Sequence, residues 1–71
     1  MKITVSEKIR LIMKRLEMSM TDLEATTGQT RQNLSNKMSR GNFSEKDIEM
    51  IASAMGCTVE IKFTLPDGTE L

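Results

Sequence analysis

The sequence predicts a mainly α-helical domain: a compact bundle of four to five helices followed by one short β-strand. Three observations support this fold class. Hydrophobic residues recur at helical spacing over most of the chain, glycines and short polar residues stand where helices would end and begin, and strict alternation starts only after Gly56. We expect a single domain over residues 1–71, with a helical core over 6–56 and the strand over 58–65.

Two segments show one apolar face each, which predicts amphipathic helices. The first is expected over Ser6–Met18, because its apolar residues fall at i, i+3, i+4 and i+7. The second is expected over about Glu45–Met55, where the same kind of spacing returns. The apolar residues are Ile9, Ile12, Met13 and Leu16 in the first segment, and Ile48, Ile51, Ala52 and Met55 in the second.

Short polar residues and glycines mark the expected helix ends. A hydroxyl side chain at an N-cap accepts a hydrogen bond from the backbone about three residues later, and an acidic residue there can return one. Glycine at a C-cap adopts the left-handed conformation without a steric penalty. The expected N-caps are Ser19, Thr30 and Ser44, with Asp22, Asn33 and Asp47 three positions on, and the expected C-caps are Gly28, Gly41 and Gly56.

Residues 19–40 predict two short helices joined by a tight turn. Leu23 is the apolar anchor of the first of them, and Gly28 ends it. Leu34 is the strong apolar anchor of the second helix, at about 31–39, whose other side chains are almost all polar. Polar side chains at the start of a helix match the hydrogen-bonding edges of bases in the major groove of DNA.

This stretch resembles the helix-turn-helix of the Cro and phage-repressor type, the Xre-like family, over about residues 6–57. The matching positions are a leucine five residues before the turn glycine, a hydroxyl residue two after it and a leucine six after it. Three positions depart from the pattern: an acidic residue stands where alanine is usual, and two polar residues stand at aliphatic sites. The matches are Leu23, Gly28, Thr30 and Leu34, and the departures are Glu24, Gln29 and Lys37.

The resemblance implies sequence-specific binding of double-stranded DNA by a transcriptional regulator, a dimeric repressor that reads the major groove with the helix at about 31–39. We expect Glu24 to oppose the phosphates, and Lys37 to turn toward a phosphate while Met38, four residues after Leu34, packs inward. The implied base-reading residues are Arg31, Gln32, Ser35 and Asn36. The implied phosphate contacts are Ser19, Thr21, Thr30, Lys37, Arg40, Asn42 and Lys46.

Composition argues against several other functions. The chain has no histidine, no metal-ligand spacing and no glycine loop that could cradle a phosphate, so we expect no catalytic residue, metal, cofactor or small-molecule substrate. Only two aromatic residues are present, Phe43 and Phe63, which are too few to stack on single-stranded nucleic acid and are expected in the core. We also expect Met13, Met38 and Met55 in the core.

The chain also lacks the features of a membrane or secreted protein. It has no apolar run near about 18 residues, no secretory signal at its start, and a single cysteine, Cys57, that fits a reducing compartment. We therefore expect a cytoplasmic protein without membrane contact.

The charges are segregated although their formal sum is zero. Residues 8–46 hold eight basic and four acidic side chains, whereas residues 47–71 hold one basic and five acidic side chains. No acidic residue lies between Ala25 and Ser44. A domain polarised in this way can present a basic face to phosphate.

The alternating segment after Gly56 raises the question of its partner. A single strand cannot satisfy its own backbone, so it must pair with Lys2–Val5, fold back through the turn at residues 66–68, or pair with its copy in a homodimer, which we favour. An alternative function is a protein-interaction module, such as an antitoxin or a complex subunit, that captures a protein partner with this strand. The strand's apolar residues are Val59, Ile61, Phe63 and Leu65.

Overall fold

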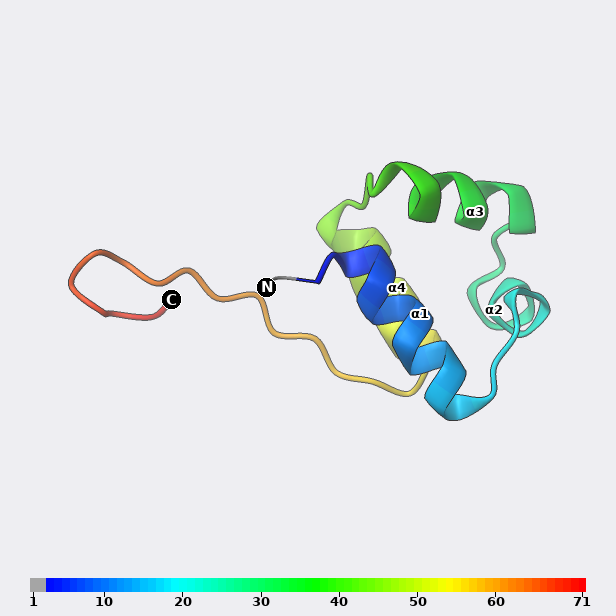
Figure 1. Ribbon diagram of the computed structural model, residues 1–71, viewed down its shortest axis with the longest axis horizontal. Helices are drawn as coiled ribbons and strands as arrows, with labels where there is room; N and C mark the ends of the chain where they lie inside the picture. The colour runs from blue at the N-terminus through cyan, green and yellow to red at the C-terminus, as the bar shows by residue number, and fades with distance from the viewer. Residues whose placement is uncertain (1–2) are drawn as a thin grey trace.

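The computed structural model describes residues 3–71, and this part of the chain contains four α-helices (Figure 1). The helices are α1 (Val5–Leu16), α2 (Met20–Thr27), α3 (Arg31–Arg40) and α4 (Glu45–Ala54). The prediction of a mainly helical domain is therefore confirmed. The option of a fifth helix is wrong for residues 3–71, because the chain after α4 takes up no further helical turn.

Side-chain caps explain where each helix starts. Ser19 and Ser44 form capping boxes with Asp22 and Asp47, and Thr30 accepts a hydrogen bond from the backbone N–H of Asn33, as the sequence predicted. Each such cap satisfies N–H groups that have no partner within the helix.

The start of α1 differs from the prediction. Thr4 is the N-cap and forms a capping box with Glu7, so α1 begins at Val5, one residue earlier than expected. The proposed strand over Lys2–Val5 is wrong for this reason, and Lys2 itself lies outside the described residues. The helix ends at Leu16 rather than Met18, because Glu17 adopts the left-handed conformation with φ of 54°.

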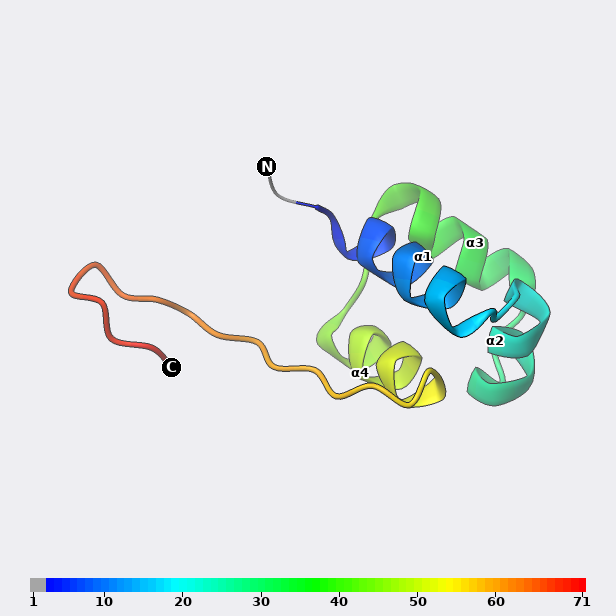
Figure 2. The same cartoon turned by 60° about the horizontal axis from the view of Figure 1, so that its bottom comes forward.

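The core lies where the four helices converge. Leu23 of α2, Leu34 of α3 and Ile51 of α4 are almost completely buried, and α2 packs against both α3 and α4 (Figure 2). The predicted burial of Met13, Met38 and Met55 is confirmed. Burial of such side chains contributes about 1.5–3 kcal/mol each, so this small cluster is the main source of stability. It consists of Ile9, Met13, Leu23, Leu34, Met38, Ile51 and Met55.

Residues 57–71, here called the C-terminal arm, leave the helical body and extend away from it (Figures 1 and 2). Phe63 and Leu71 exchange two backbone hydrogen bonds of 2.8 and 2.9 Å, the N–H of Leu65 donates to the carbonyl of Thr69 at 2.8 Å, and Thr64 forms an isolated bridge with Glu70. The arm thus folds back through the turn that the sequence indicated, but only over its last residues.

The predicted strand over 58–65 is therefore wrong. Within residues 3–71, the backbone of 58–62 forms no backbone pair, and a strand without a neighbour has no ladder to stabilise it. The prediction that Phe63 belongs to the core is also wrong, since its side chain is 74% exposed, whereas Phe43 packs at the edge of the core.

Candidate nucleic-acid interface

Helix α3 presents one polar face to solvent. Leu34 and Met38 are buried and fix the inner side of the helix. The four predicted base-reading residues occupy positions on the outer side that are one and four residues apart, which places them in one stripe along the helix. All four are exposed: Arg31, Gln32, Ser35 and Asn36.

The turn before α3 sets its position against α2. Gly28 has φ of 74°, a left-handed conformation that side chains strongly disfavour, and its N–H donates to the carbonyl of Glu24 at 3.0 Å. Thr30 then caps α3. Only three residues, 28–30, separate the two helices, so α2 and α3 form a helix-turn-helix unit.

Arg31, the first residue of α3, is bonded to two side chains of α2. Its Nε lies 3.6 Å from Oε1 of Glu24, and its Nη2 donates a hydrogen bond to the hydroxyl of Thr21. The arginine and glutamate side chains are 57% and 38% exposed. We expected Glu24 to oppose DNA phosphates; in the structure its carboxylate is engaged with a candidate base-reading residue.

Lys37 of α3 bonds to one residue in the turn before α3 and to one residue of α4. Its Nζ lies 2.6 Å from Oδ1 of Asp47 and donates to Oε1 of Gln29 at 3.2 Å. The hydrogen bond from Lys37 and the backbone N–H of Ser44 lower the pKa of Asp47 from 3.8 to about 2. The ammonium predicted to contact phosphate is thus already paired with a carboxylate.

The other predicted phosphate contacts come from the starts of α2, α3 and α4 and from the end of α3. Ser19 and Thr30 use their hydroxyls as N-caps, and the hydroxyl of Thr21 accepts a hydrogen bond from the guanidinium of Arg31. A hollow of about 420 Å³ between the end of α3 and the start of α4 is lined by Asn33, Asn36, Lys37, Arg40, Asn42, Ser44 and Asp47. The structure thus brings together four predicted residues from both groups: Asn36, Lys37, Arg40 and Asn42. Lys46 is exposed on the first turn of α4.

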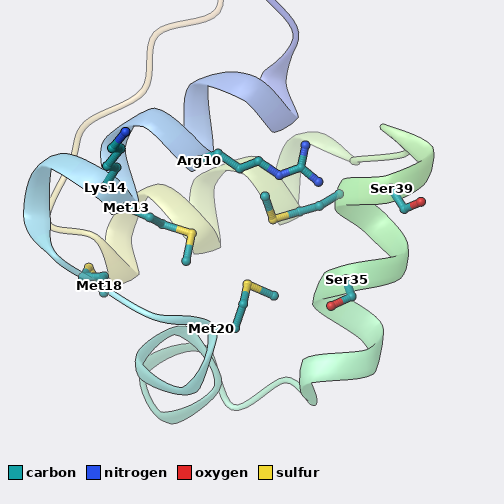
Figure 3. A pocket seen from close by; sticks show the side chains of 8 residues that line it. Arg10, Met13, Lys14, Met18, Met20, Ser35 and Ser39 are labelled. Atoms are coloured by element: carbon teal, nitrogen blue, oxygen red, sulfur yellow. The ribbon is translucent and has the colours of Figure 1, made fainter.

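A second hollow, of about 540 Å³, lies between α1 and α3 beside the polar face (Figure 3). Figure 3 shows Arg10 extending from α1 toward α3, with Ser35 and Ser39 on the opposite wall. Four methionines line the space between them: Met13, Met18, Met20 and Met38. Arg10 therefore adds a basic side chain near α3 that spacing within α3 could not reveal.

Residues 8–60 match the family model of the Cro/C1-type HTH DNA-binding domain. The chain belongs to this family. The comparison with curated proteins and the comparison with solved structures gave no match. The resemblance seen in the sequence is thus confirmed, and membership of this Cro/C1-type family makes the protein a DNA-binding regulator in the general sense.

Residues 3–71 of this Cro/C1-type domain hold neither a cluster of metal ligands nor a membrane-spanning helix. No three histidine, cysteine, aspartate or glutamate residues gather there as metal ligands would. None of the helices in that range has the length and apolar character needed to cross a membrane. Cys57 is a free, half-buried thiol.

Sequence reasoning missed two residues that position the interface. Gln29, in the turn before α3, accepts a hydrogen bond from Lys37 of α3. Ser6, on α1, donates a hydrogen bond to the backbone carbonyl of Met38 of α3. The unusual polar residue at position 29 was a signal for the first of these contacts. Nothing in the local pattern around Ser6 indicated the second.

Proposed function

We propose that this protein is a sequence-specific transcriptional regulator that binds double-stranded DNA as a dimeric repressor and reads the major groove with α3. The exposed polar stripe on α3, anchored from behind by Leu34 and Met38, carries this proposal. Arginine can bind guanine through two hydrogen bonds, and glutamine and asparagine can do so to adenine, each pair discriminating by about 1–3 kcal/mol. The base-reading residues are Arg31, Gln32 and Asn36, with Ser35 beside them.

Phosphate contacts would orient α3 in the groove. The start of α2 and the start of α4 present hydroxyls, backbone N–H groups and the positive end of the helix dipole. Three exposed side chains at the end of α3 and the beginning of α4, Arg40, Asn42 and Lys46, flank the polar stripe. Together with Ser19, Thr21 and Thr30, they are the contacts that would fix the register without reading sequence.

The C-terminal arm supports the dimeric form. Its apolar side chains are exposed in the monomer, with Phe63 and Leu71 the most exposed, and exposed apolar side chains gathered on one segment indicate an interaction surface. A second copy would cover them and place two α3 helices about one helical turn of DNA apart, roughly 34–36 Å. The contact residues are Val59, Ile61, Phe63 and Leu65. A bound dimer would repress by occupying a promoter, which needs no cofactor.

In-vitro selection tests the DNA-binding part of the proposal. The full chain is mixed with a pool of random duplexes at near-physiological salt, and bound duplexes are sequenced. We expect an inverted repeat with half-site centres about 10 base pairs apart. The double variant Q32A/N36A should lose the motif, whereas E49A, an exposed change on α4, should retain it. A pool without enriched sequences contradicts sequence-specific binding.

Sedimentation equilibrium tests the arm. The variant I61S/F63S should be monomeric at concentrations where the wild-type chain is dimeric. T64A, which leaves the four apolar residues of the arm in place, should remain dimeric. A wild-type chain that is monomeric both alone and on its selected duplex overturns the dimer. A monomer that also enriches no duplex favours the second function, a protein-interaction module that uses the exposed arm.

A further inference from the structure

Two of the sequence's departures from the family pattern are in contact with each other. Positions 29 and 37, where aliphatic residues are usual, hold Gln29 and Lys37, and the glutamine Oε1 accepts a hydrogen bond from the lysine Nζ at 3.2 Å. The same ammonium lies 2.6 Å from Oδ1 of Asp47. A polar cluster thus occupies a place where the pattern calls for an apolar contact, and it joins the turn, α3 and α4.

The cluster is largely buried, and each of its members makes more than one contact. The side chains of Lys37 and Asp47 are only 25% and 19% exposed. The other carboxylate oxygen of Asp47 accepts the backbone N–H of Ser44 at 3.0 Å, which caps α4, and the amide of Gln29 faces the sulfur of Met50 at 3.7 Å. Each member therefore holds a different element, and the ammonium is the atom that connects them.

Lys37 occupies the middle of the C-terminal half of α3, next to Asn36 and one turn before Arg40. The other end of α3 is held by the turn and by the link from Arg31 to α2. The charge of this ammonium is already compensated within the protein by the carboxylate of Asp47. The contacts thus favour an internal role over a DNA contact.

We propose that Lys37 is a positioning residue that fixes the orientation of α3 against α4 through Gln29 and Asp47, and does not neutralise a phosphate. This inference rests on the proposed function, since it concerns the helix that reads DNA. A recognition helix must be held to within about 0.5 Å of its productive geometry by packing and by supporting hydrogen bonds. Loss of the cluster would therefore weaken base reading more than non-specific attraction to phosphate.

The two roles of Lys37 predict opposite effects of removing the charge of Asp47. If Lys37 contacted phosphate, D47N would release its ammonium and strengthen binding to any duplex. If Lys37 positions α3, D47N and K37M should each weaken binding to the selected duplex by about tenfold, a typical size for coupling within one salt-bridge network. Binding to a random duplex of equal length should change by less than about twofold, because the phosphate contacts remain.

Salt dependence and rescue complete the experiment. K37M should leave the slope of log Kd against log salt unchanged, whereas the control K46M should lower its magnitude by about 0.9, the value for one phosphate contact. The variant Q29L/K37M restores two apolar side chains and should recover most of the specific affinity. D47N changes the shape of its side chain least, and urea unfolding checks that each variant is folded.

Three outcomes overturn the positioning role: tighter binding by D47N, a reduced salt slope in K37M, or failure of folded Q29L/K37M to regain specific affinity. If the wild-type chain binds neither duplex, the proposed function itself fails and the positioning role falls with it. If the wild-type chain binds and D47N strengthens binding, only the positioning role fails.

Discussion

The hydroxyl of Ser6 donates a hydrogen bond of 2.7 Å to the backbone carbonyl of Met38, linking the first turn of α1 to the last turn of α3. Carbonyls in the last turn of a helix have no partner within it, and the N–H groups of Gly41 and Asn42 both bond to the carbonyl of Lys37 instead. Ser6 therefore satisfies a group that would otherwise be buried without a partner, and it joins the recognition helix to the rest of the body.

Replacement of Ser6 by alanine should destabilise the domain by about 1–3 kcal/mol, the cost of leaving a buried carbonyl without a hydrogen bond. The free energy of unfolding in urea measures this directly. S53A is the matched control, because Ser53 is exposed on α4 and its loss should change stability by less than about 0.5 kcal/mol. Equal stabilities for the two variants would show that the link between α1 and α3 is dispensable.

Replacement of Gly28 by alanine should destabilise the domain by about 1–2 kcal/mol through backbone strain alone. The glycine has φ of +74°, and a Cβ added there would meet no atom within 4 Å, so no steric clash contributes. G28N should cost less, since asparagine tolerates the left-handed conformation better. Urea unfolding of the two variants should give this order; a larger loss for G28N would contradict the strain argument.

The pair of Arg31 and Glu24 predicts a change in DNA specificity rather than in stability. Both side chains are in part accessible to solvent, at 57% and 38% exposed, so E24Q should alter the free energy of unfolding by less than about 1 kcal/mol. Without the carboxylate, the guanidinium loses its orientation, and preference for the base read by Arg31 should fall by about 1 kcal/mol. In-vitro selection with E24Q measures this as a relaxed position in the motif.

The control for this prediction is the remainder of the motif. Positions read by Gln32 and Asn36 should keep their preferences in E24Q, because the ion pair of Glu24 is with Arg31. A loss of preference at every position would indicate that Glu24 acts on the placement of α3 as a whole.

The local parts of this structure were predictable from the sequence. Caps such as Ser19 and Ser44 act over three residues, and the buried positions Leu34 and Met38 follow from helical spacing, so the exposed face of α3 follows as well. The pairs that position this face were not predictable. Whether Lys37 reaches Asp47 depends on how two helices cross, which no spacing along one helix encodes.

The strand predicted within the C-terminal arm was wrong for a related reason. Alternation of Val59, Ile61, Phe63 and Leu65 reports which side chains share a face, but a strand forms only when a neighbour supplies hydrogen bonds. In the single chain only the end of the arm finds such a neighbour, its own last residues. Sequence periodicity therefore could not show that residues 58–62 lack a backbone partner, and the predicted strand was wrong.

The ion pair between Lys37 and Asp47 makes stability depend on acid pH. The pKa of Asp47 falls from its usual 3.8 to about 2 on folding, so between these values the unfolded chain binds more protons than the folded one. The stabilisation is fully present above about pH 4 and is lost as the pH falls toward 2.

Thermal unfolding of D47N between pH 5 and 2 should therefore show a shallower loss of stability than the wild-type chain. S53A, an exposed change on the same helix that removes no titratable group, should keep the wild-type slope. Identical slopes for D47N and the wild-type chain would mean that the pair does not persist in solution.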